Sequence, residues 1–174
     1  MSRRAGESPQ AWRARAVAMQ ASYTSAKAAL ERGDFAAASS GFDAILKDEP
    51  GFLDAPQLLM QAREGVRRGS VKDAIEAGDK LDAAGDWPGA AQKYDQAHQI
   101  DPAAPGLNEA IKRVRDKMRV AGADAFKRAR QYDALGRSAD AIKDYEKAAQ
   151  YLPTDDPNRK VARDRADQLK SGAK

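Results

Sequence analysis

The clearest pattern of apolar positions predicts a short amphipathic helix near the middle of the chain. Ala90, Tyr94 and Ala97 are separated by four and three residues, which places their side chains on one face of a helix. Asp86 precedes them and can accept hydrogen bonds from the free amides of the first helical turn. Pro88 suits that turn, because its nitrogen carries no hydrogen that would be left unpaired. The pattern therefore predicts where the helix begins and which face is buried.

The same pattern occurs twice more, at a nearly constant distance along the chain. A glycine precedes each copy, and Gly33, Gly85 and Gly136 are 52 and 51 residues apart. The corresponding apolar positions in the other two copies are Ala38, Phe42 and Ile45, and Ala141, Tyr145 and Ala148. Such an internal period is typical of repeat proteins, whose units bury their apolar faces against one another.

A longer helix is predicted before each short one. The predicted long helices cover about residues 9–32, 56–84 and 106–135, and a last helix covers residues 156–170. Gly65, Gly69, Gly78 and Gly122 fall inside these spans, and a glycine in a helix interior costs about 1 kcal/mol relative to alanine. The pattern leaves open whether the long helices continue through Gly69 and Gly122.

These elements predict an all-α fold, a right-handed α-solenoid of long and short helical hairpins that ends in a capping helix. Residues 1–7 are expected to be disordered, and residues 8–174 to form a single repeat domain. Its hairpin units cover about residues 8–50, 53–102 and 105–153, followed by the capping helix at 156–170. Stacked hairpins of this kind leave a concave surface lined by the long helices. The half-unit at the end predicts a domain of a larger protein.

Three segments resemble tetratricopeptide repeats over about 34 residues each, or roughly three fifths of the chain. The matching residues are Ala26, Ala29, Gly33, Asp34, Phe35, Ala38, Phe42 and Pro50; Gly78, Leu81, Gly85, Asp86, Trp87, Ala90, Tyr94, Ala97 and Pro102; and Ala129, Tyr132, Gly136, Ala141, Tyr145, Ala148 and Pro153. The spacing between copies is longer than the family's usual tandem period. The resemblance implies a helical repeat fold that binds peptides or protein domains.

The resemblance also implies which side chains meet a ligand, because the first helix of each repeat usually lines the groove. Those positions are Tyr23, Lys27 and Leu30; Ile75, Asp79 and Asp82; and Phe126, Arg130 and Asp133. The first residue of each set is apolar or aromatic, namely Tyr23, Ile75 and Phe126. The second residue of each set is charged, and the sign alternates along Lys27, Asp79 and Arg130. Alternatively, the apolar members pack between helices, since both interpretations require the same residue types.

Residues for catalysis or metal binding are scarce. The chain has one histidine and no cysteine, so it can build neither a Cys–His pair nor a site with several histidines. The segment from Gly65 to Gly69 is not followed by the Gly-Lys-Ser/Thr sequence that ends a phosphate-binding loop. We therefore predict no enzymatic activity, no cofactor and no metal site.

The charge distribution predicts a basic patch on the third long helix and on the capping helix. The net charge of the chain is +4. The patch is formed by Lys112, Arg113, Arg115, Arg119, Arg159, Lys160 and Arg163. Basic patches can bind phosphates or anionic lipid, but no aromatic residues lie between these cations to stack on bases. The pattern therefore disfavours nucleic acid and favours an acidic protein partner.

Together these features predict a non-enzymatic scaffold that binds a segment of a protein partner, or another domain of its own polypeptide, in the concave groove. The resemblance implies a domain of a larger bacterial signalling or envelope-assembly protein. One alternative is a basic helical adaptor for nucleic acid or an anionic surface. Another alternative is a solenoid that self-assembles. The main prediction, in contrast, is a chain that is monomeric or associates only weakly.

The sequence also bears on location. No run approaches the roughly 18 apolar residues that a membrane span needs, and the N-terminus lacks the apolar region of a secretory signal. A chain without cysteine suits a reducing compartment. These features predict a cytoplasmic location, or a periplasmic one if the chain is part of an exported protein.

Overall fold

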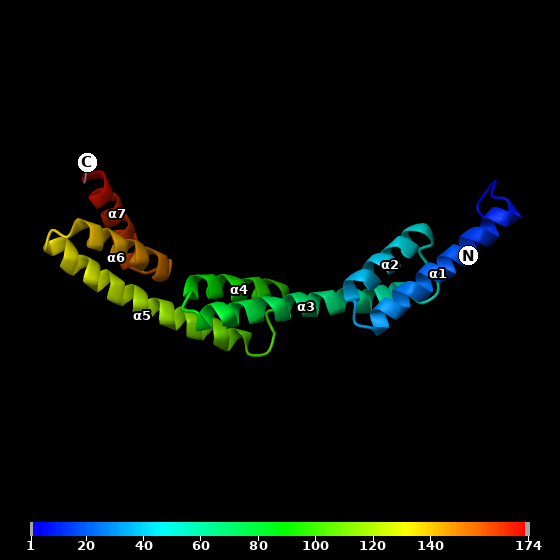
Figure 1. The fold of residues 1–174 in the computed structure, drawn as a ribbon, viewed down its shortest axis with the longest axis horizontal. Coiled ribbons are helices and arrows are strands. Elements are labelled where there is room, and N and C mark those ends of the chain that lie inside the picture. The colour runs from blue at the N-terminus through cyan, green and yellow to red at the C-terminus, as the bar shows by residue number, and fades with distance from the viewer. Residues whose placement is uncertain (1, 173–174) are drawn as a thin grey trace. The chain divides into compact units, whose positions relative to one another are not determined.

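The computed structural model describes residues 2–172 as seven α-helices, with no strand in that range (Figure 1). They are α1 (Pro9–Glu31), α2 (Phe35–Asp48), α3 (Ala55–Ala83), α4 (Trp87–Ile100), α5 (Leu107–Ala134), α6 (Ser138–Tyr151) and α7 (Pro157–Gly172). The predicted all-α fold and the alternation of long and short helices are confirmed. The helices α3 and α5 continue through Gly69 and Gly122, the two positions that the sequence pattern left open.

Side-chain caps explain where several of these helices begin. Ser8, Asp34 and Asp86 each accept a hydrogen bond from the amide three residues further on, at 3.1, 3.1 and 3.0 Å. Each bond satisfies one of the amides that a helix N-terminus leaves unpaired. Pro9 and Pro88 stand in the first turns of α1 and α4, as their sequence context predicts.

The tight turns between long and short helices depend on glycine. Gly33, Gly85 and Gly136 have φ angles of 77°, 81° and 69°. This left-handed conformation is open to glycine but strained for residues with a Cβ atom. The three glycines that define the sequence period therefore occupy the same backbone conformation in each copy.

The chain divides into two compact units, with the boundary between Ser70 and Val71 inside α3. The first contains α1, α2 and the beginning of α3. The second contains the rest of α3 and the helices α4 to α7. The sequence predicted a single domain from residue 8, preceded by disorder. In the first unit, Glu7 lies against α1 and accepts a hydrogen bond from Nε of Arg15 at 2.8 Å, which lowers the pKa of Glu7 to about 2.

The core of the first unit is a three-helix cluster. Phe42 of α2 is fully buried, and Tyr23 of α1 packs edge-on against it with ring centroids 6.1 Å apart. Tyr23 makes a similar contact with Phe52 at 5.8 Å and donates a hydrogen bond to Asp54. The beginning of α3 completes the cluster through Ala62 and its neighbours. We call this cluster the first core.

The second unit contains two further clusters of the same kind, and α5 belongs to both. The second core joins the end of α3, α4 and the first half of α5 around Tyr94 and Leu107. The third core joins the second half of α5, α6 and α7 around Ala129 and Tyr145. Contacts between the two cores fix them within one unit. The rings of Trp87 and Tyr151 meet edge-on with centroids 6.1 Å apart.

Equivalent residues make equivalent contacts in successive copies. Asp43 accepts a hydrogen bond from Arg63 at 2.7 Å within the first unit, and Asp95 accepts one from Arg115 at 2.8 Å within the second. Both partners of the second pair lie 52 residues after those of the first. The sequence period is thus a period in contacts as well.

Candidate functional site

A shallow groove opens on the third core between α5 and α7, with a volume of about 550 Å³. It is lined by Phe126, Arg130, Tyr145, Asn158, Val161, Asp164, Arg165 and Gln168, and we call it the Phe126 groove. Its apolar part is an aromatic pair and an aliphatic side chain. The ring of Phe126 is half-buried and meets Tyr145 edge-on at 6.0 Å, while Val161 is 53% exposed.

A second hollow lies along α5 beside Phe126 and Arg130. Its volume is about 390 Å³, and it is lined by Phe126, Lys127, Arg130, Gln131 and Ala134. Phe126 and Arg130 therefore border both hollows. Lys127 and Arg130 are exposed, so this part of α5 presents an aromatic ring beside two cations.

An ion-pair network holds α7 against α5 at the edge of the Phe126 groove. Asp133 accepts hydrogen bonds from Nε and Nη2 of Arg165 at 2.7 and 2.9 Å, and from the Tyr145 hydroxyl at 3.3 Å. The hydrogen bond from Arg165 lowers the pKa of Asp133, and burial together with the Asp133 charge raises the pKa of Tyr145. The charge of Arg165 is therefore balanced within the protein.

The three predicted ligand positions of the third repeat differ from one another in their surroundings. Phe126 and Arg130 line the Phe126 groove, whereas Asp133 is engaged in the network with α7. In the second repeat, Asp79 accepts a hydrogen bond from the Tyr94 hydroxyl at 2.6 Å. The neighbouring Asp82 accepts hydrogen bonds from α5.

The remaining predicted positions contribute mainly to cores. Ile75 is half-buried against the second core. Tyr23 is buried in the first core and Leu30 packs partly against it, whereas Lys27 is exposed. The nine positions are divided between two units, and only Phe126 and Arg130 among them line the Phe126 groove.

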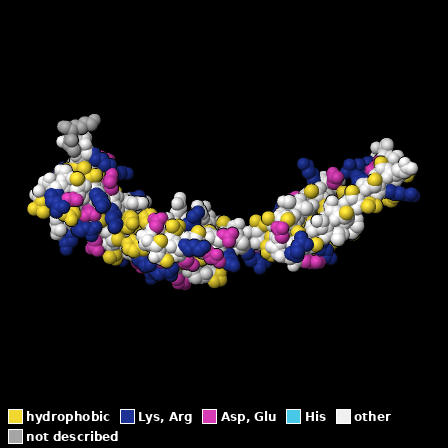
Figure 2. Space-filling view, viewed as in Figure 1, with side chains coloured by type: hydrophobic (Ala, Val, Ile, Leu, Met, Phe, Trp, Pro, Cys, Tyr) yellow, Lys and Arg dark blue, Asp and Glu magenta, His cyan; other side chains and the backbone are white. Residues whose placement is uncertain are grey.

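The structure assigns the predicted basic patch to two different cores. Arg113, Arg115 and Arg119 lie on the first half of α5, and each has a carboxylate within 4 Å: Asp82 at 3.3 Å, Asp95 at 2.8 Å and Asp116 at 3.7 Å. Lys112 is exposed on the same half of α5. Arg159, Lys160 and Arg163 lie on α7, which belongs to the third core. Figure 2 shows cationic and acidic side chains interspersed on the visible face of the second unit.

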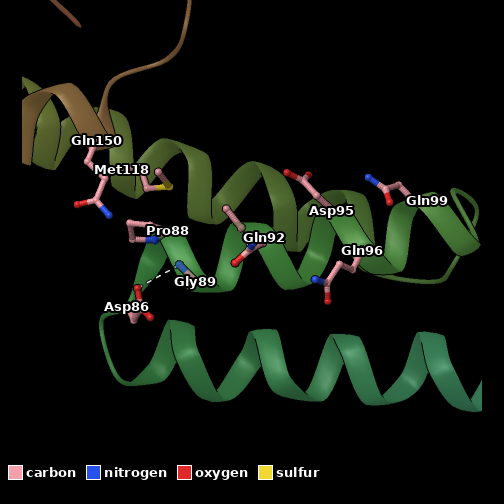
Figure 3. Close-up of a pocket in the computed structure, with 10 residues that line it drawn as sticks. Asp86, Pro88, Gly89, Gln92, Asp95, Gln96, Gln99, Met118 and Gln150 are labelled. Atoms are coloured by element: carbon pink, nitrogen blue, oxygen red, sulfur yellow. Dashed lines mark hydrogen bonds between the residues drawn. The ribbon is translucent and has the colours of Figure 1, made fainter. Parts of the chain in front are cut away.

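A larger hollow lies on the outer face of α4, and sequence reasoning missed it. Its volume is about 830 Å³. It is lined by Asp86, Pro88, Gly89, Ala91, Gln92, Asp95, Gln96, Gln99, Met118 and Gln150, and we call it the glutamine groove. Figure 3 shows Met118 of α5 and Gln150 of α6 at the Pro88 end. The recurrence of glutamine at 92, 96 and 99 is a signal that could have been read from the sequence.

No protein-family model, curated protein sequence or solved structure matches this chain. Within residues 2–172, no group of three or more His, Asp or Glu side chains is placed to hold a metal ion. A search of the same residues also finds no helix with the length and hydropathy needed to cross a membrane.

The carboxylates that tie α3 and α5 to their neighbours predict acid sensitivity. Hydrogen bonds from Lys117 and Arg165 lower the pKa values of Asp82 and Asp133 below the usual 3.8. A carboxylate whose pKa is lower in the folded state stabilises the fold above its unfolded-state pKa, and this contribution is lost as pH falls through the folded-state pKa. The free energy of unfolding should therefore decrease as pH falls from about 5 to below 3.

Urea denaturation at pH 7, 4 and 3 would measure this decrease, and Asp133→Asn should make it smaller. The control is Asp155→Asn, which removes an exposed carboxylate from the connection before α7. If the two variants have the same pH dependence as the unaltered chain, the network around Asp133 does not contribute to acid sensitivity.

Proposed function

We propose that this chain is a non-enzymatic scaffold that binds a segment of a partner protein at the Phe126 groove. One observation carries the proposal: Phe126 and Arg130, at positions where the resemblance to tetratricopeptide repeats implies ligand contact, lie together on an open groove with an aromatic wall. Large aromatic side chains and arginine are the residue types that contribute most to protein interfaces. A ring that is only half-buried has further surface to remove from water when a partner binds.

The charges around the groove indicate which partner fits it. Lys127 and Arg130 are exposed beside Phe126, whereas the positive charge of Arg165 is balanced by Asp133. The one carboxylate that lines the groove, Asp164, lies 3.9 Å from the guanidinium of Arg163. The unbalanced charge is therefore positive. An acidic segment with one apolar anchor would place its side chain against Phe126 and its carboxylates near the two cations. This favours an acidic protein partner over nucleic acid, for which the paired arginines of α5 offer little free charge.

The architecture that we propose for this function is a right-handed solenoid of three extended tetratricopeptide-like repeats. Its support is the recurrence of the glycine turn, the short helix and the Arg–Asp pair at intervals of 51 or 52 residues. We also propose that the chain acts as part of a larger bacterial signalling or envelope-assembly protein. That step rests on the family resemblance alone.

A pair of substitutions tests the groove. The chain is immobilised, source-cell lysate with and without nuclease treatment is passed over it, and retained proteins are quantified by mass spectrometry. Phe126→Ala combined with Arg130→Glu should reduce retention of an acidic partner at least tenfold, because it removes the anchor and reverses one charge. The control combines Val17→Ala with Arg13→Glu, an exposed apolar residue and cation four positions apart on α1.

Circular dichroism of the variants completes the test. We expect the helical signal to be unchanged, because Phe126 is half-buried and Arg130 is exposed. Retention that survives the groove substitutions would overturn the proposal, and loss of the helical signal would show that Phe126 serves the core. Retention that vanishes with nuclease in every variant would favour nucleic acid, and concentration-dependent mass in light scattering would favour self-assembly.

A further inference from the structure

We infer that the glutamine groove is a second binding site, which takes an extended, uncharged segment of another protein and contacts its main chain. The inference rests on the chemistry, spacing and charge of the α4 surface. It does not depend on the Phe126 groove, which lies on the third core and shares no lining residue with it.

The side chains that border the groove match the hydrogen-bonding groups of a polypeptide backbone. A glutamine side chain carries a carbonyl acceptor and an amide with two donors, so it can pair with a backbone N–H and a backbone C=O. Gln92, Gln96 and Gln99 are at positions i, i+4 and i+7 of α4 and therefore share one face of this helix, while Gln150 comes from α6 near the Pro88 end (Figure 3). A segment lying along this face of α4 would meet the three amide groups one after another.

The spacing of these glutamines fits an extended chain. Gln92 and Gln99 are seven positions apart on α4, or about 10 Å along a helix axis at 1.5 Å per residue. An extended chain covers this distance in about three residues at roughly 3.3 Å each. Neighbouring glutamines at 92, 96 and 99 therefore lie within reach of successive backbone groups. The groove volume of about 830 Å³ is within the usual range for ligand sites.

The charges in the groove favour an uncharged segment. Its lining includes no lysine, arginine or histidine. Of its two carboxylates, Asp95 is paired with a cation, and Asp86 caps α4 at the Pro88 end of the groove, away from Gln96 and Gln99 (Figure 3). Asp95 accepts a hydrogen bond from Arg115 at 2.8 Å, and Asp86 accepts the amide of Gly89 at 3.0 Å. At the rim, Lys93 donates to Oε1 of Gln96 at 3.3 Å, an exposed contact that a ligand can replace.

The apolar part of the groove is small and adaptable. Ala91 and Pro88 contribute little side-chain volume beside α5, and Met118 has a flexible side chain that adjusts to irregular surfaces. A surface made of these three residues accepts small side chains of a bound segment without selecting among them. A segment rich in serine, threonine and glutamine therefore suits the site better than one with large apolar anchors.

The test uses a capped seven-residue peptide of serine, threonine and glutamine as the probe, titrated into the full-length chain labelled with ¹⁵N. We expect the side-chain amide signals of Gln92, Gln96, Gln99 and Gln150 to shift. The same peptide, N-methylated at alternate backbone amides, should bind at least tenfold more weakly, because it has lost half of its main-chain donors. Raising the salt concentration from 50 to 500 mM should change Kd less than about twofold, since no charged pair forms.

Two double variants locate the site. Gln96→Leu with Gln99→Leu should raise Kd for the probe about tenfold, because two amides are replaced by side chains of similar size. The control is Gln57→Leu with Gln61→Leu, which alters two exposed glutamines four positions apart on α3 in the first unit. The inference is overturned if the probe causes no shift in the four amide signals, if N-methylation leaves Kd unchanged, or if both double variants weaken binding equally.

Discussion

Replacing Tyr94 by alanine is expected to lower the free energy of unfolding of the second unit by about 3–5 kcal/mol. Its side chain is among the largest that are fully buried in the described residues. The ring lies directly against Gly78 of α3, and the hydroxyl donates to Asp79 at 2.6 Å. Burial, followed by the contact with Asp79, raises the pKa of Tyr94 to about 12. Truncation would leave a cavity in the second core that the surrounding helices α3 and α5 cannot easily close.

Tyr94→Phe separates the ring from the hydroxyl. It should destabilise the unit by only about 0.5–1.5 kcal/mol, the usual net contribution of one hydrogen bond. The first core already has a phenylalanine, Phe42, at the equivalent position, 52 residues earlier. Each unit has one tryptophan, so urea denaturation followed by Trp87 fluorescence in a Trp12→Phe background reports on the second unit. Equal losses for the alanine and phenylalanine variants would show that the ring does not stabilise the core.

Replacing Gly78 by valine should destabilise the same unit by about 3 kcal/mol, at the upper end for an overpacked core. A Cβ atom at this position would lie 2.5 Å from Cε1 of Tyr94, closer than non-bonded carbon atoms approach. Valine adds two further methyl groups at that contact. Relief requires the buried ring to move, and the better helix propensity of valine over glycine is worth only a few tenths of a kcal/mol.

Gly69 provides the matched control, because a Cβ atom there would meet nothing within 4 Å. Gly69→Val should therefore change the free energy of unfolding by less than about 0.5 kcal/mol. Gly69 belongs to the first unit, so the measurement follows Trp12 fluorescence in a Trp87→Phe background. If Gly69→Val is as destabilising as Gly78→Val, the loss reflects valine in a long helix and not the contact with Tyr94.

The local pattern of the sequence was enough to predict the helices, because their ends depend on neighbouring residues. Asp86 and Pro88 define the start of α4 through a cap and a first turn, and both act within three positions. Gly85 ends the preceding helix because its left-handed conformation requires glycine. The seven helices of the described chain therefore begin and end close to their predicted residues.

The roles of the aromatic residues could not be predicted in the same way. Tyr23 and Phe126 occupy equivalent positions in the repeat, and both satisfy the requirement for an apolar side chain. Tyr23 is buried because Phe52, in the connection before α3, packs against it. Phe126 has an edge-on contact with Tyr145 but remains half-exposed beside α7. The difference depends on the connecting segment and the neighbouring helix, which the repeat pattern does not specify.

The three-helix cores were also beyond the sequence pattern, which indicated stacked hairpins. Packing between residues far apart in the sequence is not specified by the local pattern: at Gly122, for example, a Cβ atom would lie 3.0 Å from the backbone nitrogen of Leu152, thirty residues away. The helices α3 and α5 have 29 and 28 residues, and the two halves of each contribute to successive cores. This double role accounts for a period longer than the 34 residues of tandem tetratricopeptide repeats.

The sharing of α5 between two cores changes where the molecule can be divided. A cut in a connection, such as the one after α4, would remove the first half of α5 from the second core and expose Tyr94 and its neighbours. A cut near Gly122, in the middle of α5, would leave every helix of the first and second cores in place. The self-contained module of this protein therefore runs from the middle of one long helix to the middle of the next. Segments exchanged or duplicated between those points would preserve complete cores, whereas segments bounded by loops would not.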